Sequence, residues 1–400
     1  MDEVSSHLHS WVFVNLQPPF EGVSLVDTSA KTNRRSARYI PIDLAGAPEV
    51  DVLLEQLGFG FLVRPEVTTS PGRNDIWIGP TQSGKQVFVK RLTGRSEYIS
   101  ERIERMRAFE RFREESGPGP LNSPELIASD KDTGLCVFVC LDGARTGAEL
   151  AADDRFDTSL AESAGRALGT VHAGSRHHLA DLDASRPHMP DPGFFVGLPR
   201  GMYDRLTTAE VDTWKILQQD ASLHQAIAEL CSAESGYPVV PSHGDLRLDQ
   251  FLVTGETLYV SDWEEFRLTD PARDVGNYAG QWLQRAVLDI VSAPGSDFRD
   301  ADLTHEDVME RGAANLIRVR PLVEHFWHAY GDRHTAADPD LPRRATSYAG
   351  WHLLERLLAS AGQINRLTGI ERAAAGIGRA ALIHPERFSS TIGLSGEARA

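Results

Sequence analysis

The sequence predicts an α+β fold with two lobes: a small lobe built on an antiparallel sheet, then a large lobe that is mostly helical. Two observations support this prediction. Between residues 50 and 141, short segments that alternate apolar and polar residues surround one strongly helical segment, which is the pattern of a small sheet with a helix. Beyond this part, long amphipathic helical segments lie at 275–292, 302–331 and 346–384.

Length and local composition suggest where the parts divide. A chain of 400 residues accommodates one large or two modest domains with a substantial apolar core. The first residues form an irregular polar lead, in which Trp11–Val14 has the apolar character of a strand. We therefore expect three parts: an N-terminal extension at 1–47, an N-terminal lobe at 48–141 and a C-terminal helical lobe at 142–400.

The first strands of the small lobe are expected at Ile76–Ile78 and Val87–Val89, with a hairpin turn at Gln82–Lys85 between them. This turn lies inside a near match to the phosphate-binding pattern G-x-x-x-x-G-K-[ST], which runs from Gly79 to Gln86. The match fails because Gln86 lacks the required hydroxyl, and because a strand follows where a helix must begin.

The helical segment from Glu97 to Glu115 contains an acid that faces inward. Glu110 lies one turn after Met106, in the middle of the apolar face of this helix. Burying an unpaired carboxylate costs on the order of several kcal/mol, so Glu110 needs a cation nearby. Lys90, on the preceding strand, is the expected partner, and Glu114 is the alternative acid.

The most informative stretch is 243–264, which places two acids and an amide around a short hairpin. Asp245 lies on a tight loop, Gln250 follows five residues later, and Asp262 stands 17 residues after Asp245. The hairpin, expected from Phe251–Val253 and Leu258–Val260, brings both acids to the same end. Phosphoryl transfer from a nucleotide uses one carboxylate to orient or deprotonate the acceptor hydroxyl, and an amide and a second carboxylate to hold magnesium. Asp245 is therefore the candidate catalytic residue, and Asp262 and Gln250 are the candidate metal ligands.

The segments His243–Gln250 and Ser261–Glu264 resemble the catalytic loop and metal-binding tetrapeptide of the aminoglycoside phosphotransferase and choline kinase group. Asp270–Asp274 resembles the D-P-x-x-D continuation of the same group. The resemblance implies a bilobal protein-kinase-like fold, with ATP as phosphate donor and Mg²⁺ as metal. Gln250 departs from the family pattern, which has asparagine at this position; the amide is kept on a side chain one methylene longer.

A protein-kinase-like fold implies further nucleotide contacts in the small lobe. Lys90 is expected to bind the nucleotide phosphates, and Glu110 is expected to hold the lysine. The turn Ser70–Asp75 is the candidate cover for the phosphates, with Arg73 and Asn74 as candidate contacts. The hinge is expected at Leu141–Arg145, where backbone groups would bind the adenine.

A finer resemblance concerns the acceptor. Gly72–Leu92, together with the two catalytic segments, is similar to the kinase component of class V lanthipeptide synthetases. That similarity implies a ribosomal precursor peptide whose Ser or Thr hydroxyls accept phosphate, and a separate partner lyase that then eliminates it. Arg247, Asp249 and Glu264 are the acceptor-side candidates.

Two alternatives remain open. A small-molecule kinase for an aminoglycoside or an amino alcohol would carry nearly the same catalytic residues, because fold and nucleotide chemistry do not identify the acceptor. A weakly active, kinase-like scaffold that binds a peptide or a partner lyase is the other, and it is suggested by Gln250. The presence of Asp245, Asp262 and Lys90 argues against the scaffold.

Composition narrows the remaining classes. The formal net charge is −16, which argues against a nucleic-acid partner and suits a cationic substrate. No apolar run reaches ~18 residues, so we expect no membrane span, and the acidic, polar start is unlike a signal peptide. The three cysteines fit a reducing, cytoplasmic compartment.

Neither the cysteines nor the histidines suggest a metal site. Cys136 and Cys140 are expected to lie in the core, which is where free cysteine is most often found. His177, His178 and His188 lie in a stretch rich in Asp, Pro and Arg without the compact spacing of zinc ligands, so we expect a solvated loop there.

Overall fold

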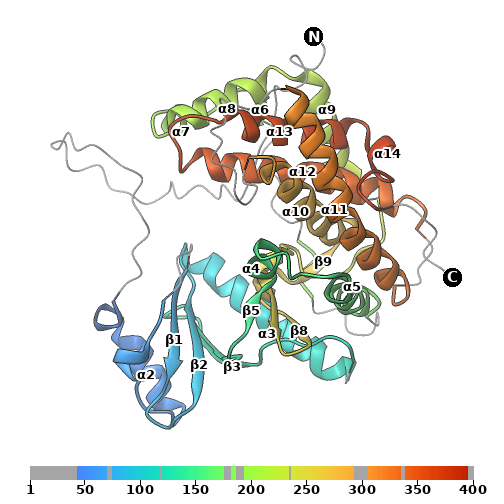
Figure 1. Cartoon of the computed structure of the whole chain (residues 1–400). Coiled ribbons are helices and arrows are strands. Elements are labelled where there is room, and N and C mark those ends of the chain that lie inside the picture. Colours follow the sequence, from blue (N-terminus) through green and yellow to red (C-terminus); the bar gives the residue numbers. More distant parts are fainter. Residues whose placement is uncertain are drawn as a thin grey trace.

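A computed structural model describes residues 43–69, 74–117, 119–174, 182–185, 193–233, 236–291, 305–334 and 338–394. Within these ranges the chain forms a small sheet lobe and a larger helical lobe, with α3 lying between them (Figure 1). Parts of the chain singled out above lie outside the described residues: positions 1–42 of the N-terminal extension with Trp11–Val14, positions 70–73 of the expected phosphate-covering turn with Arg73, and His177, His178 and His188.

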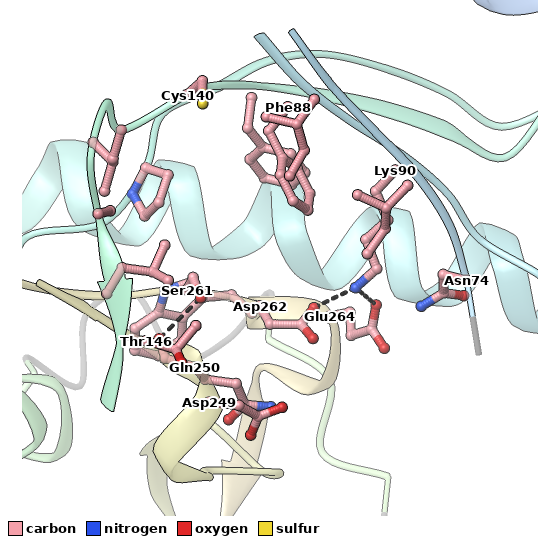
Figure 2. Close-up of a pocket in the computed structure, with 18 of the residues that line it drawn as sticks. Asn74, Phe88, Lys90, Cys140, Thr146, Asp249, Gln250, Ser261, Asp262 and Glu264 are labelled. Atoms are coloured by element: carbon pink, nitrogen blue, oxygen red, sulfur yellow. Dashed lines mark hydrogen bonds and ion pairs between the residues drawn. The ribbon is translucent and has the colours of Figure 1, made fainter. Parts of the chain in front are cut away.

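Four antiparallel strands make the sheet of the small lobe, in the order β1-β2-β4-β3. They are β1 (Asp75–Pro80), β2 (Gln86–Arg91), β3 (Leu126–Asp130) and β4 (Leu135–Val139), and the predicted hairpin between the first two is confirmed. Because side chains alternate along a strand, Val87 and Val89 enter a core with Trp77 and α2 (Pro48–Gln56). Phe88 and Lys90 point to the opposite face, toward the helical lobe (Figure 2).

Helix α3 (Ser96–Ser116) confirms the predicted helix and packs against both lobes. Near its middle, Ile103 and Met106 pack under the sheet against Cys136. Further along, Phe109 and Phe112 belong to the core of the helical lobe. Phe109 stacks on Trp263, with ring centroids 3.8 Å apart. The helix is therefore fixed both to the sheet and to the segment that carries Asp262.

The stretch 243–264, which carries the candidate catalytic and metal-binding residues, lies on short strands between the lobes. The predicted hairpin is confirmed as β7 (Phe251–Thr254) and β8 (Thr257–Val260), and β5 (Arg145–Thr146) extends it. A second small sheet pairs β6 (Val240–Ser242) with β9 (Arg267–Thr269). Single turns of 3-10 helix at Leu248–Gln250 and Trp263–Glu265 follow the two acids.

Helices dominate the large lobe, as predicted. They are α4 (Gly147–Ala152), α5 (Thr158–His172), α6 (Gly193–Val196), α7 (Arg200–Tyr203), α8 (Thr208–Gln218), α9 (Ala221–Ala233), α10 (Ala272–Leu288), α11 (His305–Gly331), α12 (Leu341–Ala361), α13 (Gly369–Ile383) and α14 (Pro385–Phe388). In the described ranges, none of these helices combines the length and the apolar character that crossing a bilayer requires.

The long segment expected at 346–384 is two helices. A capping box begins the second helix, α13, because the Thr368 side chain accepts from the backbone N–H of Glu371, and the Glu371 carboxylate accepts from that of Thr368. α10 and α12 pack closely at Gly276, where a Cβ atom would overlap the carbonyl oxygen of Ala345 and the Cβ of Tyr348. This close packing fixes the start of α10, and with it the end of the chain segment that follows 243–264.

Candidate active site

A cavity of about 1140 Å³ lies between the sheet and the helical lobe. The sheet side is lined by Phe88 and Lys90, and the chain between Val139 and Ala144 lines it where β4 leads toward β5. The opposite wall carries Asp245, Gln250 and Asp262. Cys140, expected in the core, is half-buried and lines this cavity, whereas Cys136 is buried, which raises the pKa of its thiol to about 12.

Asp274 shapes the loop that carries Asp245. Its carboxylate accepts from the backbone N–H groups of His243, at 2.6 Å, and of Gly244, at 2.9 Å. Burial favours the neutral acid, but the hydrogen bond with His172 and the backbone donors outweigh it and hold the pKa of Asp274 below its usual range. Gly244 has a φ of +86°, and a Cβ there would lie 2.6 Å from the carbonyl oxygen of Glu265, so only glycine fits.

Asp245 points into the cavity with a third of its side chain exposed. Its Oδ2 lies 2.6 Å from Nη1 of Arg247, and Nε of the same arginine lies 3.1 Å from Oδ1 of Asp249. The attraction of Asp245 outweighs burial and raises the pKa of Arg247, so the arginine stays charged. Arg247 therefore bridges two acids, and it holds Asp245 in a fixed orientation.

Gln250 is buried, and its amide is turned inward. Its Oε1 accepts from the backbone N–H of Arg247 at 2.7 Å. This contact fixes the orientation of the amide, because the flipped amide would place its NH₂ group against the Arg247 N–H, and two donors do not bond. The atom left without a hydrogen-bond partner among the described residues is Nε2, a donor. A donor cannot bind a cation, so Gln250 as placed does not fit the predicted role of metal ligand.

Asp262 takes the left-handed conformation, with a φ of 69°, which is uncommon for a residue other than glycine. Strain of this kind is held where the surrounding structure fixes it, and it is frequent at functional sites. The conformation turns the carboxylate toward the cavity, where Oδ1 accepts from Nζ of Lys90 at 2.5 Å (Figure 2). Asp262 is therefore the carboxylate best placed for a metal ion.

Lys90 has a second acid, which belongs to the same tetrapeptide. Its Nζ donates to Oε2 of Glu264 at 2.6 Å, and the other oxygen of Glu264 pairs with Arg102 of α3. Burial alone lowers the pKa of Lys90, but the charges of Asp262 and Glu264 outweigh it and raise the pKa. Two cations and two acids thus form one compact network, and its link between Lys90 and the two acids is drawn in Figure 2.

The structure corrects two expectations about acids. Glu110 does not pair with Lys90, because its Oε2 lies 2.5 Å from Nη2 of Arg113. The physical reason is helix length: Glu110 is eight residues beyond Arg102, which corresponds to ~12 Å along the axis. Glu264, expected on the acceptor side, is buried behind Lys90 instead. Glu110 lines the cavity, so its contact with a nucleotide remains a prediction.

Asn74 lies beside Lys90 at the rim of the cavity (Figure 2). Its Oδ1 accepts from the backbone N–H of Thr93 at 3.2 Å and lies 3.5 Å from Nη2 of Arg102. This oxygen therefore supports the network around Lys90. The predicted contact of Asn74 with nucleotide phosphates remains a prediction, as do the acceptor-side roles of Arg247 and Asp249.

Sequence reasoning missed Arg102 and gave no role to Asp274. Arg102 was hidden because an arginine on a charged helix usually lies in solvent, whereas here its side chain is 0% exposed. A signal for Asp274 was present in the Asp270–Asp274 motif. The role of Arg102 had no comparable local signal.

A family model described as the phosphotransferase enzyme family (APH) matches residues 76–313, which is more than half of the chain and includes Lys90, Asp245 and Asp262. The chain belongs to this family. As an APH-family phosphotransferase it acts on hydroxyl groups, and it has the bilobal protein-kinase-like fold predicted from the motifs.

Solved structures of several kinases are similar to this APH-family chain at low identity. They include the macrolide 2′-phosphotransferase from Brachybacterium faecium (19% identity, 84% of this chain and 97% of that chain, TM-score 0.45) and the choline kinase from Streptococcus pneumoniae (16%, 77% and 98%, 0.39). A third is amicoumacin kinase in complex with AMP-PNP, Ca²⁺ and Ami (13%, 84% and 93%, 0.49). No curated protein sequence matches the chain.

Proposed function

We propose that this phosphotransferase moves the γ-phosphate of ATP to a hydroxyl group, with Mg²⁺ as the metal. The observation that carries the proposal is that Lys90, Asp245 and Asp262 line one cavity, although they come from different parts of the chain. Lys90 would bind the phosphates as a point charge, and Asp262 would hold the metal. Asp245 would orient the acceptor hydroxyl and take its proton as the new oxygen–phosphorus bond forms and the bond to ADP breaks.

The donor set fits one magnesium ion better than two. Mg²⁺ prefers oxygen ligands and is commonly held by one or two carboxylates together with substrate phosphates. Asp262 supplies such an oxygen, while the Gln250 oxygen is already bonded to the Arg247 N–H. A bound metal ion would neutralise charge on the phosphates. The protein's own share is to hold Asp262, Lys90 and Asp245 in fixed positions.

We further propose that the acceptor is a Ser or Thr of a precursor peptide. The cavity exceeds the usual ~300–1,000 Å³ of small-ligand pockets and continues past Asp245 to the end of α12. There its wall mixes the apolar Leu358 and Ala359 with the polar Arg356 and Gln363. Such mixed lining, with room beyond the nucleotide, suits a peptide segment better than a compact sugar. A partner lyase would then remove the phosphate.

A cationic small molecule is the second candidate, and a specific observation favours it. Acids other than those proposed to act on the phosphates or the metal also line the cavity, among them Asp142, Glu149, Glu210 and Asp249. Two of these carboxylates already accept backbone hydrogen bonds, because Glu149 and Glu210 form the capping boxes at the starts of α4 and α8. Asp249, with about half of its side chain exposed, and Asp142 are the acids best placed to meet an amino group.

One experiment separates these acceptors. The protein is incubated with ATP, Mg²⁺ and a candidate precursor peptide, with and without the lyase, and in parallel with an aminoglycoside and an amino alcohol. Peptide species heavier by about 80 Da, or lighter by about 18 Da with lyase, support the peptide. Phosphorylation of a small molecule alone overturns the peptide proposal. Little ATP consumption with any of these acceptors favours a weakly active scaffold.

A further inference from the structure

Helix α3 holds the segment that follows Asp262 through side chains on one of its faces. Tyr98 donates to Oε1 of Glu265 at 2.9 Å, and Arg102 pairs with Glu264. One turn further, Nη1 of Arg105 lies 3.4 Å from Oε2 of Glu265. Together with the stacking of Phe109 on Trp263, these contacts fix the backbone of the segment that carries Asp262.

Glu264 is held beside Lys90 by its burial and by its pairing on both carboxylate oxygens. Its side chain is 9% exposed, and each carboxylate oxygen meets a different cation, Lys90 on one side and Arg102 on the other. Asp262 is more exposed, at 27%, and faces the cavity. If Asp262 turns to a metal ion during the proposed reaction, Glu264 remains as the fixed acid beside the lysine.

The charged side chain that α3 contributes here is a cation, whereas the sequence predicts an acid. The helix was expected to supply a glutamate to the lysine, but it supplies Arg102, whose side chain is fully buried. A buried guanidinium needs an acid, and Glu264 serves as the acid for both cations. The position of Lys90 thereby depends on α3 through Glu264 and not through a direct contact with a helix acid.

We infer that Glu264, held from behind by Arg102, is the positioning residue that sets Lys90 for the nucleotide phosphates. This inference rests on the proposed ATP chemistry and adds to it two residues outside the Asp245, Asp262 and Lys90 set. Glu264 does not touch the reacting atoms, so its loss should affect nucleotide binding more than the chemical step.

The test uses Glu264→Gln and, as a matched control, Glu104→Gln, which makes the same change on a partly exposed acid of α3 that does not line the cavity. The dissociation constant for ATP is measured by calorimetry with excess Mg²⁺. We expect Glu264→Gln to weaken ATP binding about tenfold, and to raise KM for ATP more than it lowers kcat, while Glu104→Gln stays within about twofold of wild type. The double variant Lys90→Met/Glu264→Gln should bind ATP no worse than Lys90→Met alone, because both changes remove one interaction.

A second measurement needs no nucleotide, and so separates this inference from the proposed function. The rate at which an acetylating reagent modifies Lys90 is followed by peptide mass spectrometry. The ion pair with Glu264 holds the buried amine of Lys90 in place. Losing that pair frees the amine to meet the reagent, so Lys90 should be labelled several-fold faster in Glu264→Gln and at the wild-type rate in Glu104→Gln. This result supports the pairing even if the wild type fails to bind ATP, an outcome that would refute the proposed function alone.

A second pair of variants tests the inference if Glu264→Gln fails to fold. Arg102→Lys keeps the positive charge beside Glu264, so it should retain more ATP affinity than Arg102→Met. Circular dichroism identifies variants that fail to fold. Wild-type ATP affinity and a wild-type labelling rate in a folded Glu264→Gln would overturn the inference. A loss of ATP affinity in Glu110→Gln alongside that result would restore the helix glutamate as the partner of Lys90.

Discussion

Nζ of Lys90 lies 2.6 Å from Oε2 of Glu264, a residue 174 positions further along the chain. This contact joins the sheet of the small lobe to the segment that follows the catalytic hairpin. Because Arg102 of α3 pairs with the same glutamate, the strand, the helix and the segment that carries Asp262 meet at one carboxylate. The arrangement explains how a lysine that is 7% exposed remains charged at the edge of the cavity.

Asp245→Asn should remove most of the phosphotransferase activity. The amide keeps the shape of the side chain but cannot accept a proton, and it weakens the contact with Arg247. We expect kcat to fall by about two or more orders of magnitude, with ATP affinity and melting temperature close to wild type. Steady-state kinetics with a cognate acceptor measures this. Near-full activity in the variant would remove Asp245 from its proposed role.

Asp262 and Gln250 should respond differently to metal concentration. Asp262→Ala removes the proposed metal ligand, so metal-dependent ATP binding should be lost. Gln250→Ala removes the acceptor for the Arg247 N–H and loosens the loop that carries Asp245. We therefore expect kcat to fall about tenfold, with no change in the Mg²⁺ concentration that gives half-maximal activity. A clear rise in that Mg²⁺ requirement would show that the amide binds metal after all.

Glu355 should make the protein less stable as the pH rises. Burial raises the pKa of this carboxyl from 4.5 to about 7, and it has a hydrogen bond from Nε1 of Trp351 at 2.9 Å. Between pH 4.5 and about 7 the unfolded chain releases the proton while the folded protein still holds it. The contribution of Glu355 to stability is therefore full below pH 4.5 and is lost as the pH rises through about 7.

Glu355→Gln tests this, because the amide resembles the protonated acid and does not titrate. The free energy of unfolding should match wild type near pH 4, and should exceed it near pH 8 by on the order of 1–3 kcal/mol. Chemical denaturation at both values measures the difference. The same difference at both pH values would show that titration of Glu355 is not responsible.

Gly276→Ala should destabilise the helical lobe. The new methyl group would overlap Ala345 and Tyr348 of α12, and backbone atoms there cannot move without shifting the helix. We expect a loss of about 1–3 kcal/mol in the free energy of unfolding. Gly201→Ala in α7 is the control, since no atom lies within 4 Å of its Cβ position, and it should be neutral or slightly stabilising. Equal effects would contradict the proposed close packing at Gly276.

Much of the fold could be predicted because its signals are local. The strand–turn–strand pattern around Gln82–Lys85, the helix from Glu97 to Glu115 and the hairpin between Asp245 and Asp262 depend on alternation, helical period and turn residues within about 20 positions. The division of the segment 346–384 into two helices was missed, because apolar residues continue at helical spacing across it. The capping box at Thr368 is the local mark of the new helix.

The sequence by itself determined the fold class, the catalytic stretch and the phosphotransferase family, since motif spacing within one stretch carries that information. Only the tertiary structure decided which acid holds Lys90. The helical period placed Glu110 on the apolar face, but it could not say how far along the axis the lysine would meet the helix. That distance depends on how α3 packs between the sheet and Trp263, and it brings Arg102 and Glu264 to the lysine instead. Contacts between distant segments follow from packing, which no local pattern records.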